Sequence, residues 1–178
     1  RSSAAADVYK RQEYDRGVAK FNQELRLITS PITSWDFYGD IINDFRTINS
    51  DAKLINDLGT QSKWLNENWD LKSILKDEVI VVTDASLKIV FASQNIAKMN
   101  GYTPAEVIGN SPRMFQGEKT CAIVSNEIRK AIMNKVSFEK KVINYKKNGD
   151  LYYCLIKGFP VFNKTGDLSH FIAFEQAA

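Results

Sequence analysis

The chain has 178 residues, of which 44% are hydrophobic and 25% are charged, a composition that excludes wholesale disorder. Its net charge of +3 is too small to indicate a nucleic acid or an anionic membrane as the partner. Two isolated cysteines, Cys121 and Cys154, and the single His170 argue against a disulfide framework, a metal site and serine–histidine catalysis. No apolar stretch approaches the roughly 20 residues that a membrane-spanning helix needs, so we expect a cytoplasmic protein.

Residues 1–12 are small residues that run into a basic stretch without apolar periodicity. Such a segment is expected to be disordered. Its sequence, RSSAAADVYKRQ, also resembles the translation of a sequencing adaptor, with Ala6 departing from it. We interpret the segment as either a natural flexible tail or a cloning or sequencing artefact, and we base no function on it.

Residues 13–77 are predicted to form a helical N-terminal extension, because apolar side chains recur there at helical spacing. Ser50 is a candidate cap and Gly59 a candidate stop for one helix, and Asp70 is a candidate cap for the last one. The pattern predicts helices over residues 13–29, 34–48, 50–59 and 71–76, with a short fourth segment over residues 60–69. The apolar stripe of the 34–48 helix needs a partner, which we expect to be the protein core or a second subunit.

At Glu78 the apolar period changes from helical to extended, which predicts a domain boundary there. Thr103 and Glu106 have the spacing of a helix-capping box, and Asn148-Gly149 is typical of a tight hairpin turn. The predicted strands cover residues 79–83, 88–92, 136–145, 151–161 and 168–175. The predicted helices cover residues 95–100, 103–108 and 120–134. This order of elements predicts an α+β domain over residues 78–178.

Five segments of this domain resemble the PAS family, and in particular its flavin-binding light-oxygen-voltage (LOV) branch. They follow the family's order and spacing and read VIVVTDASLKIVFAS, NGYTPAEVIGNSPRMFQG, EIRKAI, INYKKNG and GDLSHFIAF. The resemblance covers residues 78–178. It implies the PAS fold, a five-stranded antiparallel sheet with short helices and one long helix, and a sensory domain that binds a small ligand.

Four positions keep the residues with which LOV domains hold flavin. By this resemblance Arg113 and Arg129 would clamp the flavin phosphate, a role suited to permanently charged guanidinium groups. Asn144 matches the first strand asparagine that bonds the edge of the flavin ring, and Gln116 matches the glutamine of the LOV motif. The resemblance makes FMN the leading cofactor, ahead of FAD, and it disfavours haem because the long helix has no histidine.

Four other positions depart from the LOV pattern. Pro112 occupies the place of the cysteine that forms the photoadduct, so we expect thiol-adduct photochemistry to be lost. Ser111 replaces the motif asparagine, Cys154 replaces the second ring-binding asparagine, and Glu175 replaces the glutamine whose amide flips in light signalling. An inward-facing Glu175 must find hydrogen-bond donors or take up a proton, which would raise its pKa.

Simpler interpretations of these residues stay open. Arg113 and Arg129 are equally explained as solvated surface cations, and Asn144 as a partner of backbone groups at a strand end. Cys154 is also explained as a small buried hydrophobe. We expect His170 on a strand surface rather than as a haem ligand.

Together these residues predict a sensory PAS module and no enzyme, because the pocket offers no convincing pair of nucleophile and base. No kinase, cyclase or DNA-binding segment follows Glu175, so we expect output through protein–protein contacts of the N-terminal helices. We expect these helices to form a homodimer or to bind a partner signalling protein. Two alternatives stay open, a PAS domain that binds a metabolite other than flavin and a ligand-free module for oligomerisation or partner binding. No nucleic acid, membrane or metal is expected as a partner.

Overall fold

The computed structural model describes residues 33–65 and 69–178, with side chains from Gly39 onward. The chain divides into two compact units, Arg1–Asn43 and Asp44–Ala178. The sheet and both cavities described below lie in the second unit. The predicted N-terminal tail and the first predicted helix lie outside the described residues.

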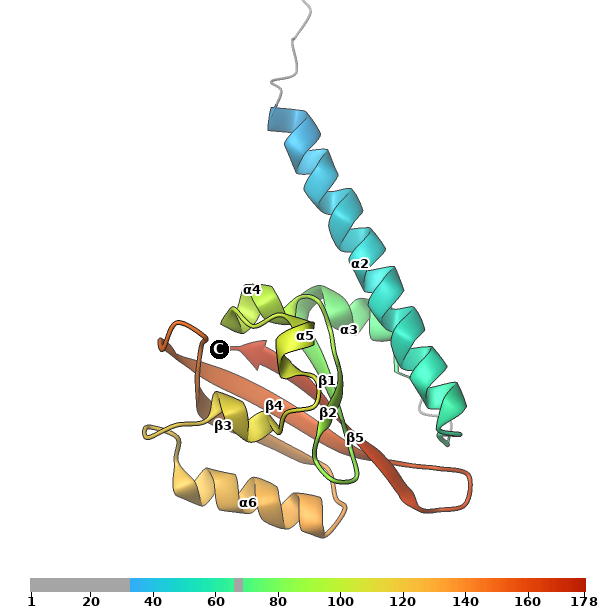
Figure 1. Ribbon diagram of the computed structural model, residues 1–178, viewed down its shortest axis with the longest axis vertical. Helices are drawn as coiled ribbons and strands as arrows, with labels where there is room; N and C mark the ends of the chain where they lie inside the picture. Colours follow the sequence, from blue (N-terminus) through green and yellow to red (C-terminus); the bar gives the residue numbers. More distant parts are fainter. Residues whose placement is uncertain (1–32, 66–68) are drawn as a thin grey trace, which may run out of the picture. The chain divides into compact units, whose positions relative to one another are not determined.

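The described residues form five helices, one 3-10 helix and five strands (Figure 1). The helical segments are α2 (Thr33–Gln61), α3 (Leu71–Asp77), α4 (Ile96–Asn100), α5 (Pro104–Val107), η1 (Pro112–Phe115) and α6 (Ala122–Met133). The strands are β1 (Val79–Asp84), β2 (Ile89–Ala92), β3 (Phe138–Tyr145), β4 (Leu151–Phe162) and β5 (Leu168–Ala177). They pair antiparallel in the order β2-β1-β5-β4-β3, which confirms the predicted five-stranded α+β fold.

The two faces of the sheet are covered by different parts of the chain, because alternate residues of a strand point to opposite sides. On β5, Phe171 and Glu175 point to an inner face that carries a cavity beneath η1 and α6. Ile172 and Phe174 of the same strand point to the outer face, where they pack against α3 and the second-unit part of α2. The strand β5 is therefore the direct physical link between the cavity and the N-terminal helices.

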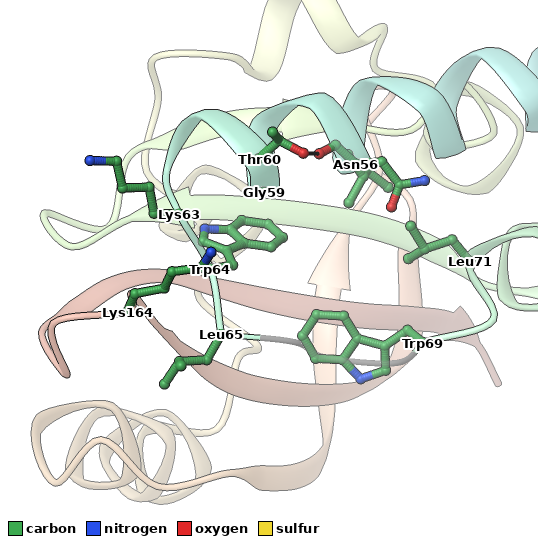
Figure 2. Close-up of a pocket in the computed structure, with 10 residues that line it drawn as sticks. Asn56, Gly59, Thr60, Lys63, Trp64, Leu65, Trp69, Leu71 and Lys164 are labelled. Carbon is green, nitrogen blue, oxygen red and sulfur yellow. Dashed lines mark hydrogen bonds between the residues drawn. The ribbon is translucent and has the colours of Figure 1, made fainter.

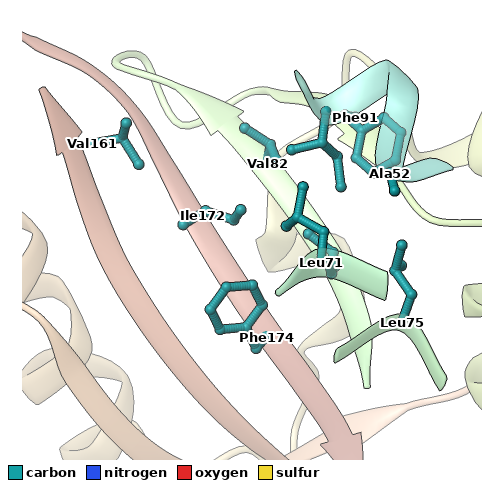
Figure 3. Close-up of a cluster of buried hydrophobic side chains, with 10 residues drawn as sticks. Ala52, Leu71, Leu75, Val82, Phe91, Val161, Ile172 and Phe174 are labelled. Atoms are coloured by element: carbon teal, nitrogen blue, oxygen red, sulfur yellow. The ribbon is translucent and has the colours of Figure 1, made fainter. Parts of the chain in front are cut away.

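The outer face holds the larger of the two hydrophobic clusters (Figure 3). Helical residues insert between side chains of the central strands, and each fully buried aliphatic side chain contributes on the order of 2 kcal/mol. The cluster comprises Ala52, Ile55, Leu71, Leu75, Ile80, Val82, Phe91, Val161, Ile172 and Phe174. These contacts make the end of α2 part of the folded domain.

The prediction of separate helices over residues 34–48 and 50–59 was wrong, because α2 runs without a break through Ser50. No glycine or proline interrupts the chain there, and the Asn49 side chain donates a 2.8 Å hydrogen bond back to the Phe45 carbonyl. The buried carboxylate of Asp51 accepts a 2.8 Å hydrogen bond from the Gln94 backbone N–H. Asp51 therefore ties α2 to the loop before α4 instead of capping a new helix.

The prediction of a short fourth helical segment over residues 60–69 was wrong in the part of this segment that the structure describes. Lys63 takes a positive φ of 53°, which ends the helical path after α2. Trp64 then forms an isolated bridge with Asn163, and the Leu65 N–H donates a 2.9 Å hydrogen bond to the Phe162 carbonyl. The segment behaves as a short extended strand beside the β4–β5 hairpin, because backbone pairing there replaces the missing helical hydrogen bonds.

The predicted caps of two helices, α3 and α5, were confirmed. The carboxylate of Asp70 caps α3 by accepting from the Ser73 N–H at 3.2 Å. Thr103 and Glu106 form the predicted capping box of α5, with Pro104 at its first position. Such caps are readable in the sequence because donor and acceptor lie within one helical turn.

Candidate functional site

A cavity of about 690 Å³ lies between the inner face of the sheet and the helices η1 and α6. Small-molecule sites fall in the range of about 300–1,000 Å³ and are mostly apolar with a few polar groups. The predicted residues that line it are Ser111, Pro112, Arg113, Gln116, Arg129, Asn144 and Glu175. Of the predicted site residues, Cys154 alone does not line the cavity.

Two arginines from different elements reach this cavity. Arg113 comes from η1 and Arg129 from α6, and both side chains are exposed. Within residues 33–65 and 69–178, neither guanidinium forms an ion pair. The local sequence fixes η1, because Ser111 is its N-cap and Pro112 its first residue. Two cations without partners at one cavity are suited to bind an anionic group of a ligand.

Glu175 is a carboxyl group inside the protein, with 4% of its surface exposed. It lies on β5 opposite Val79 of β1 and Ile156 of β4, so two strands cover it from the sides. Burial raises the pKa of Glu175 to about 7, and a hydrogen bond from Cys154 opposes this rise. Near neutral pH the group is therefore poised between a protonated hydrogen-bond donor and a charged acceptor.

Cys154 lies behind Glu175 rather than in the cavity. Its side chain is fully buried, and Sγ lies 3.7 Å from Oε2 of Glu175, a distance typical of a weak thiol hydrogen bond. Burial and the neighbouring carboxylate both raise the pKa of the thiol well above its ordinary value. Cys154 is consequently a neutral thiol that contacts Glu175 and does not itself line the cavity.

Several buried polar groups at this face have no hydrogen-bond partner among the described residues. They are Thr83 Oγ1, Asn144 Oδ1, Tyr152 OH and Asn100 Nδ2. Buried polar atoms are normally paired, so unpaired ones beside a cavity indicate where a polar ligand binds. Thr83 and Asn144 line the cavity itself, and they fit a ligand whose ring carries polar atoms at its edge.

Thr83 and Gly158 were missed by the sequence analysis. Strand alternation on β1, which sets Thr83 two residues after Val81, would have found the threonine. A side chain at Gly158 would overlap with the ring of Phe138, and both residues line the cavity. Glycine is therefore required where β3 and β4 pair next to the cavity, a requirement that carries no local signature in the sequence.

A second cavity, of about 280 Å³, lies at the end of α2 near the outer face (Figure 2). Figure 2 shows the indole rings of Trp64 and Trp69 along this cavity, with Lys63 and Lys164 at its side. None of the predicted site residues lines it. The inner cavity is therefore the candidate functional site.

The expectation of a surface histidine was wrong, because the Trp64 indole covers His170 on the outer face. Burial lowers the pKa of His170, which keeps the imidazole neutral near pH 7. Within the described part of the chain, no helix has the length and apolarity to cross a bilayer. In the same part, no cluster of three or more potential ligand side chains is arranged to hold a metal ion.

A five-stranded antiparallel sheet of this strand order, with a ligand-sized cavity under short helices and one long helix, defines a PAS-type sensor fold. The chain belongs to the PAS domain family, whose profile matches residues 77–176.

Comparisons with individual proteins point to the LOV branch. The chain is 41% identical over 88 residues to Protein TWIN LOV 1 of Arabidopsis thaliana, covering 49% of this chain and 22% of that protein. It is 35% identical over 85 residues to the blue-light-activated histidine kinase of Brucella canis, covering 48% of this chain and 17% of the kinase. The chain thus spans about a fifth of the length of these relatives.

Among solved structures, the light-state structure of the photoreceptor Aureochrome1 LOV is similar, with a TM-score of 0.56 and 25% identity. The similarity covers 60% of this chain and 85% of that structure. The resemblance to LOV domains found in the sequence is therefore confirmed at the level of both sequence and fold.

Proposed function

We propose that this protein is a sensory PAS module that binds a flavin nucleotide, with FMN favoured over FAD, in the inner cavity. The observation that carries the proposal is one cavity that combines the exposed guanidinium groups of Arg113 and Arg129 with buried polar groups that lack a partner among the described residues. A flavin nucleotide presents the matching parts, an anionic phosphate and a planar ring with polar atoms at its edge. When bound, it would supply absorption of blue light and redox chemistry.

In this proposal the arginines bind the phosphate and the strand residues bind the ring. Guanidinium groups stay charged at any physiological pH and form paired hydrogen bonds to phosphate oxygens. Asn144 and Glu175 line the same cavity from β3 and β5, where a ring laid against the sheet would place its edge. Because Glu175 is buried, it would favour a neutral over an anionic ring.

We further propose that the module works without cysteine-adduct photochemistry and without catalytic activity of its own. Pro112 lines the cavity at the position of the LOV cysteine and has no nucleophile. Cys121 is exposed and Cys154 is buried behind Glu175, and neither lines the cavity. The protein would therefore respond to redox state, or to light through electron transfer.

Output through the N-terminal helices is supported by the two faces of β5. Glu175 faces the cavity, and the adjacent Phe174 faces outward, where its ring lies 5.7 Å from that of Trp69. A change in ligand contacts on the inner face would reach the outer core through one strand. It would shift α2 only if the ligand, in its two states, had different affinities for two packing arrangements of α2 against the sheet.

We also propose that the helical extension forms a homodimer or binds a signalling partner. Phe45, in the second unit, has 67% of its surface exposed, and Ile41 and Ile42 of the first unit are exposed as well. Large apolar side chains grouped on one helix are typical of interaction surfaces.

The direct test is the absorption spectrum of the purified protein, followed by titration with FMN and with riboflavin, which lacks the phosphate. We expect a structured blue absorption band that is released as flavin on denaturation. Arg113→Ala and Arg129→Ala should weaken FMN binding by roughly tenfold or more and leave riboflavin binding unchanged, because a charge-assisted hydrogen bond contributes about 1.5–3 kcal/mol. Lys130→Ala, which removes a charge from α6 outside the cavity, is the matched control.

A colourless protein that binds neither flavin would overturn the flavin proposal. If metabolites other than flavins then raise its melting temperature, the cavity belongs to a different ligand. If none does, the domain serves oligomerisation or partner binding without a ligand.

A further inference from the structure

The second cavity, at the end of α2, is built from parts of the chain that meet only when α2 is packed on the domain. Its walls come from α2, from the segment after α2, from the start of α3 and from the β4–β5 hairpin, which contributes Lys164. Ile55 of α2 and Leu71 of α3 are buried apolar side chains of this wall. As far as the structure describes them, no residue lines both this cavity and the inner one. The second cavity is therefore a separate candidate site in the same compact unit.

Two indole rings give the second cavity aromatic walls (Figure 2). The Trp64 ring lies so close to α2 that a Cβ atom at Gly59 would be 2.9 Å from it, and the indole N–H is bonded to His170. The Trp69 ring packs edge to face against that of Phe174, with the centroids 5.7 Å apart. Both rings are thus held by contacts with the rest of the protein. An apolar ligand can pack against them without the cost of first ordering them.

The second cavity also carries two positive charges on paired backbone segments. Trp64 forms a bridge with Asn163, and the Lys164 N–H donates a 2.9 Å hydrogen bond to the Lys63 carbonyl. In this antiparallel register Lys63 and Lys164 lie opposite each other, and both are exposed residues that line the cavity. Like charges at opposite positions of paired strands destabilise the pairing. Among the residues that the structure describes, neither ammonium group forms an ion pair, so an anion bound here would relieve the repulsion.

Hydrogen bonds at the end of α2 reduce the repulsion that a helix end exerts on an anion. Free carbonyl groups at a helix C-terminus carry partial negative charge. Gly59 and Thr60 of the last turn both line the cavity. The Gly59 carbonyl accepts a 2.9 Å hydrogen bond from the Trp64 N–H, and the Thr60 carbonyl accepts a 3.2 Å bond from the Lys63 N–H. The positive side chains therefore dominate the electrostatics of this cavity.

We propose that the second cavity binds a small organic carboxylate, whose apolar body packs against Trp64 and Trp69 and whose carboxylate pairs with Lys63 and Lys164. The cavity volume of about 280 Å³ lies at the lower end of the range for small-molecule sites, about 300–1,000 Å³, and suits a ligand smaller than a nucleotide. The ligand contacts α2, the segment after it and the hairpin together, so it binds only the state in which these parts are packed. It acts as an effector that holds α2 on the outer face, independently of any flavin in the inner cavity.

Binding is tested on the full chain by NMR with three probes that share one phenyl body. Phenylacetate is negatively charged at neutral pH, phenylacetamide is neutral and phenethylamine is positively charged. Phenylacetate should shift the indole N–H signals of Trp64 and Trp69 saturably. Phenylacetamide should bind at least roughly threefold more weakly, as expected for the loss of two exposed ion pairs, and phenethylamine more weakly still. Equal affinities for phenylacetate and phenylacetamide, or for phenylacetate and acetate, which lacks the phenyl body, would overturn the proposal.

Lysine variants test which residues bind the carboxylate. Lys63→Ala and Lys164→Ala should each weaken phenylacetate binding roughly twofold to fivefold, the loss expected for one exposed ion pair, and should leave phenylacetamide binding unchanged. Both side chains are exposed, so their truncation removes no part of the core. Lys72→Ala is the matched control, because Lys72 is an exposed residue of α3 that does not line the cavity. Wild-type affinity for phenylacetate in the double variant of Lys63 and Lys164 would refute the lysine contacts.

The effector role is tested by hydrogen exchange at the backbone N–H groups of Leu65 and Lys164, which pair the segment after α2 with the hairpin. Phenylacetate at ten times its dissociation constant should slow exchange there about tenfold, because it binds only the packed state. Phenylacetamide at the same concentration should slow it less. Unchanged exchange while the indole signals report binding would overturn the effector role. None of these measurements needs flavin, so this proposal and the flavin proposal fail separately.

Discussion

The indole N–H of Trp64 donates a 3.0 Å hydrogen bond to Nδ1 of His170, which lies 106 residues further along the chain. The two rings meet edge to face with their centroids 5.3 Å apart. An Nδ1 atom that accepts from Trp64 carries no proton, so this contact requires a neutral imidazole. The pair joins the segment after α2 to the outer face of β5, the strand that also carries Glu175 on its inner face.

The Trp64–His170 contact predicts a loss of stability at acidic pH. Burial lowers the pKa of His170 below its ordinary value of 6.5, with the carboxylate of Asp84 on the paired strand opposing the shift. The unfolded chain therefore binds the proton more tightly, and this contribution to stability is lost as pH falls below 6.5. His170→Gln keeps an acceptor for Trp64 but does not titrate. Urea unfolding between pH 7.5 and 5 should show a flatter pH dependence in the variant, and equal slopes would contradict the prediction.

Replacing Trp64 isolates the same hydrogen bond. Trp64→Phe removes the indole donor and leaves His170 Nδ1 with the Ser169 hydroxyl alone, 2.7 Å away, so it should lower the free energy of unfolding by about 0.5–1.5 kcal/mol, the net value of one hydrogen bond. Backbone exchange at Leu65 and Lys164 should also become faster, because both N–H groups pair this segment with the hairpin. Trp69→Phe removes an indole from the same cavity without touching His170, and it serves as the control. Unchanged exchange at both amides in Trp64→Phe would show that the hydrogen bond does not hold the segment.

Glu175 predicts a pH dependence of the opposite sign. Its pKa of about 7 exceeds the ordinary 4.5, so the folded state binds the proton more tightly than the unfolded chain. The stabilisation is complete below pH 4.5 and is lost as pH rises through 7, an effect on the order of 3 kcal/mol. Glu175→Gln is neutral at every pH. Its stability relative to wild type should increase between pH 5 and 8, and a constant difference across that range would disprove the buried, titrating carboxyl.

The strands and helices after Glu78 could be predicted because each has a local cause. Alternating apolar residues, the capping box at Thr103 and the left-handed Gly101 all act within a few residues. The prediction of a helix break at Ser50 was wrong because it missed a long-range contact. A carboxylate three turns from the helix end, Asp51, bonds a backbone group 43 residues away, and nothing near it in the sequence announces that contact.

The residues of the candidate site also divide into those that could be predicted from the sequence and those that could not. The resemblance located Arg113, Arg129 and Glu175, and the structure brings them to one cavity. The hydrogen bond from the Lys147 N–H to the Asn100 carbonyl was not foreseen, because it joins the end of α4 to the β3–β4 turn 47 residues further along the chain. Long-range contacts of this kind follow from the tertiary fold and leave no periodic pattern.

Dimer formation predicts a specific effect of Phe45. Phe45→Ser removes a large exposed apolar group from α2 and should convert a dimer into monomers in light-scattering experiments, without loss of helix. Leu54 is a matched control, because it is 51% exposed and lies nine residues away, which is half a turn around the helix. Leu54→Ser should keep the dimer. Dissociation in both variants, or in neither, would place the subunit contact elsewhere.

The close approach of the Phe138 ring to Gly158 predicts that a side chain at this position would disturb the cavity. In Gly158→Ala the new methyl group would overlap with the ring of Phe138, so the ring must move into the cavity or the strands must separate. Overpacking of this kind costs about 1–3 kcal/mol, and a displaced ring would also weaken ligand binding. Phe138→Leu in the same protein makes room for the methyl group and should restore stability. Gly39→Ala, which meets open space in α2, should instead be neutral or slightly stabilising. Gly158→Ala with wild-type stability and affinity would mean that the Phe138 ring moves freely, and the cavity wall at β3 would then be adaptable rather than fixed.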